Sequence, residues 1–180
     1  MQRCAWAESS PDYVEYHDEE WGTPLHGDDA LFERLCLEAF QSGLSWITIL
    51  RKRPAFRAAF AGFSIDAVAE FGDDDEARLM ADAGIVRNRA KIAAAVRNAR
   101  TAQQQPEGLS ALLWSFAPPG PRARPATLDD VPATSAESVA MARELKRRGF
   151  VFVGPTTAYA LMQATGMVDD HVADCFRASP

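Results

Sequence analysis

The chain has 180 residues, 47% of them hydrophobic and 24% charged, which is the composition of an ordinary globular protein with one domain over residues 1–180. No apolar run approaches the roughly 18 residues of a membrane span, and the N-terminus lacks a signal-peptide pattern, so we expect a cytoplasmic protein. The net charge of −6 at first sight argues against nucleic acid as a partner, and the spacing of the three cysteines does not suggest a disulfide framework.

The first 29 residues are rich in aromatic side chains but show little periodicity. They include Trp6, Tyr13, Tyr16 and Trp21. A polar aromatic stretch without helical rhythm is typical of a segment that packs over a core without regular structure. We therefore predict an irregular arm for residues 1–29.

Residues 31–50 are the part of the chain around which we expect the rest to be organised. Apolar residues recur there at helical spacing, Gly43 is a natural helix stop, and Ser45 is suited to cap a second helix that begins at Trp46. Glu38 falls in the last turn of the first helix, where the helix dipole disfavours a negative charge and burial raises the cost further. Such a carboxylate faces solvent, pairs with a cation or awaits a cationic ligand.

The rest of the chain predicts further helices, and no internal repeat is evident. The patterns indicate helices over residues 54–63, after Ser64, and over residues 73–82, 87–101, 109–116, 137–148 and 156–165. Residues 103–125 are rich in proline and glycine and are expected to form a surface loop that is interrupted by the short helix at 109–116. The one candidate strand is 150–153. The predicted fold class is therefore all-α.

Basic residues are concentrated in three segments although the chain is acidic overall. These segments lie within residues 51–57, 87–100 and 143–148. Basic clusters are usually solvated helix faces, but three of them allow one positive face on an acidic protein. The distribution thus permits DNA binding without establishing it.

Two cysteines and two histidines lie near opposite ends of the chain. Cys4 and His17 are near the N-terminus, while His171 and Cys175 are four residues apart, which would place them on one face of a helix. Together they make a full tetrahedral set for zinc, with no open position for water. Spacing alone leaves open the alternative that the histidines are merely structural. Cys36 has apolar neighbours and is expected in the core.

Residues 145–157 join two predicted helices through a short apolar turn bounded by Gly149 and Gly154. Glycine lets a backbone approach a phosphate, and the helix that follows offers free N–H groups at its N-terminus. A plain turn between two helices would show the same glycines, so the pattern alone leaves both interpretations open.

Four segments carry a resemblance to a known family. Residues 3–7, 16–22, 37–53 and 148–171 have the sequences RCAWA, YHDEEWG, LEAFQSGLSWITILRKR and RGFVFVGPTTAYALMQATGMVDDH. These segments resemble 3-methyladenine DNA glycosylase I, a family of the helix-hairpin-helix DNA glycosylase superfamily, and the likeness spans nearly the whole chain without a register break.

The resemblance implies a helix-hairpin-helix element at about residues 137–166. It also implies one structural Zn²⁺ that ties residues 1–20 to residues 168–178, with the ligands Cys4, His17, His171 and Cys175. The implied partner is double-stranded DNA that contains alkylated adenine, bound by a monomer. The residues expected to contact the DNA backbone are Lys146, Arg147, Gly149, Gly154 and Thr156.

An enzyme that acts on a base in a duplex must first extrude the nucleotide into a pocket. We place Tyr16 and Trp46 there as stacking walls and Glu38 as the reader of the base edge, with Trp6 and Trp21 completing or supporting the pocket. N3-methylated adenine in DNA carries a positive charge and is already a good leaving group, so shape, cation–π contact and the carboxylate could suffice for discrimination. The expected reaction is monofunctional hydrolysis of the N-glycosidic bond, which initiates base excision repair.

Asp169 follows the predicted hairpin where the superfamily generally carries a catalytic aspartate and this family often has asparagine. It either stabilises the developing sugar cation or caps the segment that bears His171 and Cys175. No lysine stands beside the hairpin as a Schiff-base nucleophile, which favours hydrolysis without strand cleavage. The alternatives are a broader alkyl-base glycosylase that uses Asp169 and a zinc-stabilised module that binds DNA without chemistry. A metallohydrolase is disfavoured because all four ligands would come from the protein.

Overall fold

The computed structural model describes residues 2–120 and 122–178, and every regular element among them is helical. In chain order these elements are η1 (Ala5–Ser9), α1 (Pro11–Glu19), α2 (Asp28–Gln41), α3 (Trp46–Ala59), η2 (Ala61–Phe63), α4 (Ile65–Ala69), α5 (Asp73–Ala81), α6 (Arg89–Gln103), α7 (Leu109–Trp114), η3 (Leu128–Asp130), α8 (Ala136–Arg148) and α9 (Pro155–Ala164). The all-α fold class is confirmed, and residues 150–153 form a turn between α8 and α9 rather than a strand.

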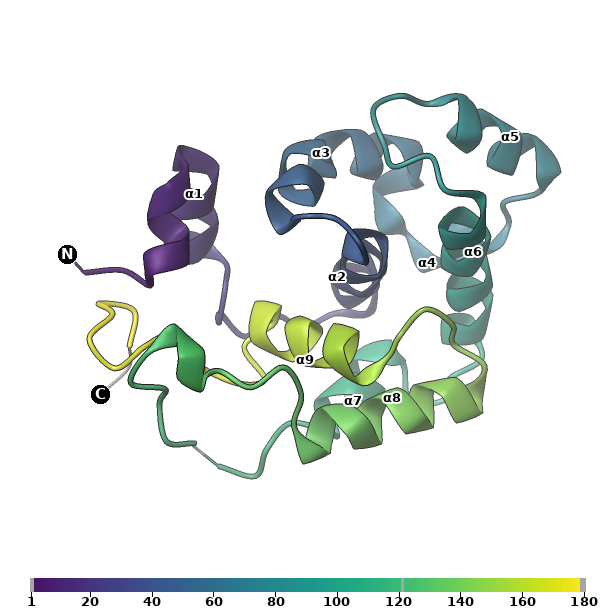
Figure 1. Cartoon of the computed structure of the whole chain (residues 1–180). Helices are drawn as coiled ribbons and strands as arrows, with labels where there is room; N and C mark the ends of the chain where they lie inside the picture. Colours follow the sequence, from purple (N-terminus) through teal and green to yellow (C-terminus); the bar gives the residue numbers. More distant parts are fainter. Residues whose placement is uncertain (1, 121, 179–180) are drawn as a thin grey trace.

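Helix α2 is the central element of the fold (Figure 1). It packs against α9, α3, α7 and α6, and every residue from Leu31 to Phe40 is buried. A helix that is covered on all sides belongs to the interior of a core. Three of its buried residues carry charge, namely Glu33, Arg34 and Glu38. Because burying a charge is costly, each of them needs a partner or a function.

The N-terminal segment is helical, so the prediction of an irregular arm over residues 1–29 was wrong. Ser10 accepts a hydrogen bond from the backbone N–H of Tyr13 and Pro11 occupies the first helical position, which starts α1 by ordinary capping chemistry. The buried residues of α1 are Tyr16 and His17 rather than aliphatic side chains. Its hydrophobic periodicity is therefore weak, although the helix is regular.

Most other helices agree with the sequence prediction. Ser64 and Ser135 accept hydrogen bonds from the N-terminal backbone of α4 and α8, and Pro155 is the first residue of α9. Ser45 is the N-cap of α3, but its hydroxyl pairs with Thr48 at 2.9 Å instead of with the backbone. Cys36 lies in the hydrophobic core, as predicted.

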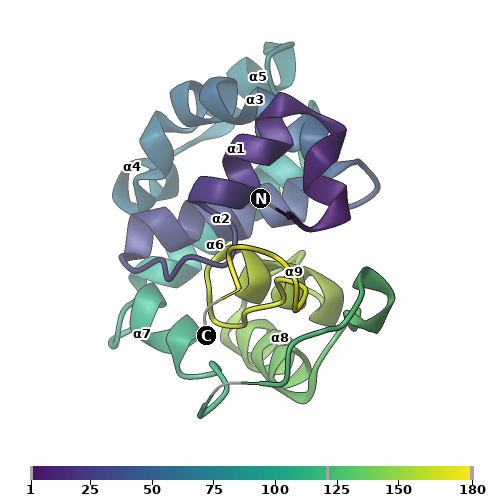
Figure 2. The ribbon, with the colours of Figure 1, turned by 90° about the vertical axis from the view of Figure 1, so that its left-hand side faces the viewer.

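The N-terminal and C-terminal segments of the described chain lie side by side (Figure 2). The backbone N–H of Phe176 donates to the carbonyl of Gln2 at 2.9 Å. Residues 171–175 form turns, so the prediction that His171 and Cys175 share a helix face was wrong.

Gly166, at φ +69°, turns the chain at the end of α9 where a Cβ would lie 2.5 Å from the backbone nitrogen of Pro24. Among the described residues no helix has both the length and the hydropathy that crossing a membrane requires.

Candidate active site

A cavity of about 400 Å³ opens between α1, α2, α3 and α9. Its lining consists of Trp6, Ser9, Tyr13, Tyr16, Trp21, Glu38, Gln41, Trp46, Ala160, Gln163 and Ala164. All five residues that the sequence analysis assigned to a base pocket are thus brought together, although they come from four separate parts of the chain. The volume lies in the range of small-molecule sites.

The aromatic residues form two walls of this cavity. The ring centroids of Tyr16 and Trp46 are 5.5 Å apart, with the planes tilted by 47°. Trp6 meets Trp21 edge to face, with centroids 5.2 Å apart and an interplanar angle of 77°. The indole Nε1 of Trp46 is buried without a hydrogen-bond partner among the described residues. Since buried donors are normally satisfied, this N–H is available to a ligand.

Glu38 of α2 lines the cavity and is 5% exposed. The alternative that this carboxylate faces solvent was therefore wrong. Burial raises the pKa of Glu38 to about 8, and the positive charge of Arg34 acts in the opposite direction. Burial, followed by the charge of Glu38, also raises the pKa of Tyr16, so its hydroxyl remains protonated at neutral pH. The cavity thus offers one acidic group and hydroxyl and indole donors on otherwise apolar walls.

Four polar residues that line the cavity were not assigned to it from the sequence. They are Ser9, Tyr13, Gln41 and Gln163. Tyr13 precedes Tyr16 by three residues on α1, and its hydroxyl accepts a hydrogen bond from the backbone N–H of Ile47 at 2.9 Å. Helical spacing from Tyr16 would have indicated Tyr13 had α1 been recognised as a helix. No comparable signal in the sequence points to Gln163.

Asp169 lies outside the lining of this cavity. Its Oδ2 accepts a hydrogen bond from Arg124 Nη2 at 2.6 Å, and its Oδ1 accepts one from the backbone N–H of His171 at 3.2 Å. It lines a neighbouring cavity together with Arg122 and Arg124. These contacts are those of a capping residue in a turn, which is the role the sequence analysis set beside a catalytic one.

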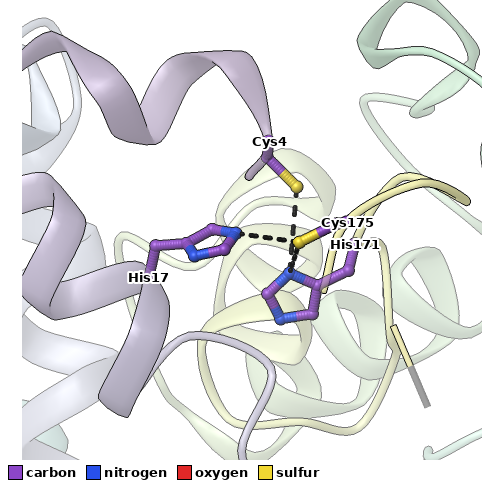
Figure 3. Close-up of side chains that lie close together, drawn as sticks. All are labelled: Cys4, His17, His171 and Cys175. Carbon is purple, nitrogen blue, oxygen red and sulfur yellow. Dashed lines mark hydrogen bonds between the residues drawn. The ribbon is translucent and has the colours of Figure 1, made fainter. Parts of the chain in front are cut away.

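The two cysteines and two histidines converge in a second, fully buried cluster (Figure 3). Their ligand atoms all lie within 4.8 Å of one another. The Sγ of Cys175 is 3.4 Å from His17 Nε2 and 3.6 Å from His171 Nδ1, and the Sγ of Cys4 is 3.8 Å from His171 Nδ1. Tetrahedral zinc with bonds of about 2.0 to 2.3 Å separates its ligands by roughly 3.3 to 3.8 Å. The donor set therefore fits Zn²⁺, and its four protein ligands would close the site.

Further hydrogen bonds orient both imidazoles of the cluster. His17 Nδ1 donates to Asp18 at 2.8 Å, and His171 Nε2 donates to the carbonyl of Trp21 at 3.2 Å. These bonds leave His17 Nε2 and His171 Nδ1 to face the sulfur atoms, as is usual for metal-bound histidines. Gly22 is required beside them, because a Cβ there would lie 2.9 Å from His171 Nε2. Burial raises the pKa of the Cys4 thiol to about 12, and a bound cation would favour its thiolate.

The turn between α8 and α9 has the geometry of a hairpin that could face an anion. Gly149 ends α8 in the left-handed conformation at φ +105°, and Gly154 precedes α9, where Thr156 is exposed in the first turn. Asn98 of α6 holds this turn, since its Nδ2 donates to the carbonyl of Val151 at 3.0 Å and its Oδ1 accepts from the N–H of Val151 at 2.9 Å.

The basic segments contribute less open charge than the sequence analysis allowed. Many of their side chains already have partners: Arg51, Arg53 and Arg57 pair with carboxylates, Arg147 and Arg148 pair with Glu144, and Arg100 donates to backbone carbonyls. Lys91 is buried and donates to the carbonyls of Phe40 and Ser42. Among the described residues of these segments, Arg87, Arg89, Arg143 and Lys146 are exposed and have neither an ion pair nor a side-chain hydrogen bond.

Comparisons with known proteins place these features in a family context. Residues 6–178 match the family model described as methyladenine glycosylase. The chain is 45% identical to DNA-3-methyladenine glycosylase 1 of Escherichia coli (strain K12) over 179 residues, which are 97% of this chain and 96% of the relative. A crystal structure of a 3-methyladenine DNA glycosylase I superposes with a TM-score of 0.94 at 43% identity, covering 99% of this chain and 100% of the other. The enzyme of the same name from Staphylococcus aureus, whose structure concerns 3-methyladenine recognition, gives a TM-score of 0.93 at 35% identity over 100% of this chain and 98% of that one.

Proposed function

The chain belongs to the methyladenine glycosylase family, and on this premise we propose that it is a monofunctional DNA-3-methyladenine glycosylase. It extrudes the damaged nucleotide from duplex DNA and hydrolyses its N-glycosidic bond, which starts base excision repair. The observation that carries the proposal is the apolar cavity that presents the buried carboxylate of Glu38 between the aromatic rings of Tyr16 and Trp46.

The cavity is suited to a flat ring that carries a positive charge. Tyr16 and Trp46 offer π-faces, which attract a cation over the ring, and Glu38 offers a carboxylate to the base edge. The free Nε1–H of Trp46 supplies a donor for a ring nitrogen. Trp6 and Trp21 also line the cavity and support each other by their edge-to-face contact. A neutral base would gain less from the carboxylate, so charge as well as shape discriminates.

Hydrolysis requires little help once such a base is bound. A methylated adenine already carries the positive charge that protonation would otherwise supply. The glycosidic electrons therefore leave with the base, while water adds to the sugar carbon and loses a proton to the solvent. A covalent step through lysine has no support, because none of the three lysines of the chain lines the cavity. Lys52 and Lys91 donate to backbone carbonyls and Lys146 is exposed on α8. The reaction therefore ends without strand cleavage.

The hairpin between α8 and α9 is proposed to hold the DNA backbone. Lys146 and Arg147 supply charge, while Gly149, Gly154 and Thr156 present backbone and hydroxyl groups to phosphates. Helix α9 connects this turn to the cavity, since Gln163 follows the first residue of the helix by eight positions, or about 12 Å along its axis. A phosphate bound at the hairpin thus lies within reach of a nucleotide extruded into the cavity.

One Zn²⁺ is proposed as a structural cofactor bound by Cys4, His17, His171 and Cys175. Its support is the separation of the ligand atoms and the hydrogen bonds that orient both imidazoles. The metal would tie residues 1–20 to residues 168–178 and would have no open position for water. For Asp169 we propose the capping role, because its contacts with Arg124 and His171 direct it away from the base cavity.

Base release from methylated duplex DNA tests the proposed function. We expect 3-methyladenine, separated by chromatography, to be released without 7-methylguanine. Release of both bases would favour the broader alkyl-base glycosylase, and release of neither by zinc-replete protein would leave a DNA-binding module. Glu38→Gln should lose base release but keep its affinity for DNA, while the matched variant of the exposed Glu15 on α1, Glu15→Gln, should keep both.

A further inference from the structure

Three charged side chains lie directly behind the aromatic wall of the cavity. Glu20, which follows α1, accepts hydrogen bonds from Arg53 Nη1 and Nη2, both at 2.6 Å, and a further one from Arg34 Nη2. Burial alone would raise the pKa of Glu20, but the bonds from Arg53 and Arg34 outweigh it and lower the pKa to about 2. The group therefore holds two positive charges and one negative charge at neutral pH. It carries a net charge of +1 beside the cavity.

Arg34 is the member of this group that reaches toward the base site. It precedes Glu38 by four residues on α2, so both side chains lie on one face of the helix. Its guanidinium carbon is 6.0 Å from the ring centroid of Tyr16, in the position of a cation over the ring. Its Nη1 is buried and has no hydrogen-bond partner among the described residues. The Glu20 pair therefore leaves part of the Arg34 charge uncompensated.

We propose that Arg34 is a positioning residue for base recognition: its buried guanidinium favours the ionised form of Glu38 and holds the ring of Tyr16 in place. The inference rests on the proposed role of Glu38 as the group that recognises a cationic base. Arg34 acts through Glu38 and Tyr16 and does not itself line the cavity. Within the described residues no ion pair joins Arg34 directly to Glu38, so the effect is that of a nearby charge.

The surroundings of Glu38 support this assignment. Tyr16 of α1 and Glu20, which follows α1, face this region. Arg53 of α3 also faces it, but its guanidinium already donates hydrogen bonds to Glu20. From α9 the neighbour is Gln163, which is uncharged. Arg34 is the one charged group that opposes the effect of burial on Glu38 among the described residues. Without Arg34 the carboxyl would hold its proton to higher pH, and a neutral carboxylic acid would favour a cationic base less strongly.

The titration of Glu38 can be followed without any measurement of catalysis. Glutamate side-chain carboxyls are labelled with carbon-13 and their chemical shifts are recorded against pH, with the Glu38 signal assigned from Glu38→Gln. Arg34→Met should move the Glu38 midpoint upward by about one pH unit, the usual size for a nearby opposite charge. Arg34→Lys keeps a cation at this position and should titrate close to the original protein.

Arg57→Met is the matched control. Arg57 also pairs with a carboxylate of α2, at 2.8 Å from Glu33, but does not act on Glu38. It should leave the midpoint unchanged. An unchanged midpoint in Arg34→Met as well would overturn the proposal. Glu20 retains both bonds to Arg53 in that variant, so the fold should survive, and Arg34→Gln gives a polar replacement with the same loss of charge.

The pH profile of base release then tests the consequence for recognition. The acidic limb of release under single-turnover conditions should shift upward in Arg34→Met by the same amount as the Glu38 midpoint and return in Arg34→Lys. A lower rate with an unmoved limb would indicate a merely structural role and would contradict the proposal. If the original protein releases no 3-methyladenine, the proposed function fails, while the carboxyl titration still decides whether Arg34 controls the charge of Glu38.

Discussion

Gln163 and Asp170 are joined by a hydrogen bond of 2.8 Å from Nε2 to Oδ2, which links the wall of the cavity to the segment that carries His171 and Cys175 of the cysteine–histidine cluster. The same carboxylate oxygen accepts a bond of 2.6 Å from the hydroxyl of Tyr159. Asp170 is buried and immediately precedes His171. Gln163 in the cavity is therefore bonded to a residue that is adjacent in sequence to His171 of the cluster.

The two neighbouring aspartates should respond differently to amide substitution. Asp170→Asn weakens charge-assisted bonds to Tyr159 and Gln163, so base release should fall by about tenfold or more, corresponding to the roughly 1.5 to 3 kcal/mol of a hydrogen bond to a charged group. Asp169→Asn still caps the turn and should leave release unchanged. Single-turnover release of 3-methyladenine measures both. A large loss in Asp169→Asn alone would restore the catalytic role of that residue.

Removal of the metal should affect stability and the base cavity together. We expect one Zn²⁺ per chain by elemental analysis, and Cys175→Ser should lose it, because it removes one of the four ligands. The melting temperature should fall strongly, since structural zinc contributes several kcal/mol to folding. Binding of free 3-methyladenine, followed by tryptophan fluorescence, should weaken as well through Asp170 and Gln163.

Cys36→Ala is the control for the loss of a buried thiol. Cys36 lies in the main core, outside the cluster, and its replacement should retain the zinc. Protein that contains no metal as isolated, and whose melting temperature is the same in Cys175→Ser as in the original chain, would contradict the zinc assignment.

The buried Glu38 should make the stability of the protein depend on pH. Burial raises its pKa from 4.5 to about 8 in the folded state, so the folded protein holds this proton more tightly than the unfolded chain. Its contribution to stability is fully present below pH 4.5 and is lost as the pH rises toward 8. Glu38→Gln removes this dependence. Its free energy of unfolding in urea should therefore match the original protein near pH 4.5 and exceed it by a few kcal/mol near pH 9. A constant difference across this range would contradict a buried, protonated Glu38.

How far the sequence determines the site is clearest from its individual residues. Glu38 could be singled out because a charge in the last turn of an apolar helix is out of place, and the cysteines and histidines because of their chemistry. Gln163 could not, since a glutamine on a helix is unremarkable until its partner Asp170 is known. The arginines of the basic segments were likewise misleading, because charge alone does not show that Glu20, Glu33 and Glu144 already engage them.

The fold, like the site, has elements that the sequence predicts and others that it does not. Helices with aliphatic stripes and caps at Ser64, Ser135 and Pro155 were predictable from local chemistry. Helix α1 was not, because its buried residues are Tyr16 and His17 rather than aliphatic side chains. The turns at 171–175 were missed for a related reason. Spacing of four residues suits a helix, but here long-range contacts with the N-terminal segment determine the backbone.

The contact between Asn98 and Val151 yields a prediction about DNA binding. Asn98 is the side chain of α6 that pairs with both the N–H and the carbonyl of this turn residue, and Arg97 Nε adds a bond of 3.1 Å to the carbonyl of Gly149. Asn98→Ala leaves the two backbone groups of Val151 without these partners, at a cost of about 1 to 3 kcal/mol. The hairpin should then lose its fixed shape, and affinity for duplex DNA, measured by fluorescence anisotropy, should fall by about tenfold. Binding of free 3-methyladenine in the cavity should persist, because no residue of the cavity lining contacts Asn98 through a side-chain hydrogen bond in the described structure.

The matched control for this change is Asn88→Ala at the N-terminal cap of α6. Asn88 caps α6 by accepting a hydrogen bond from the N–H of Lys91 at 3.1 Å, and its loss should cost about 1 kcal/mol of stability without reaching the hairpin. If both variants lose DNA affinity in proportion to their loss of stability, the hairpin contact has no specific role. If only Asn98→Ala does, the rigidity that α6 gives to residues 149–154 is what allows this turn to hold a DNA backbone beside the cavity.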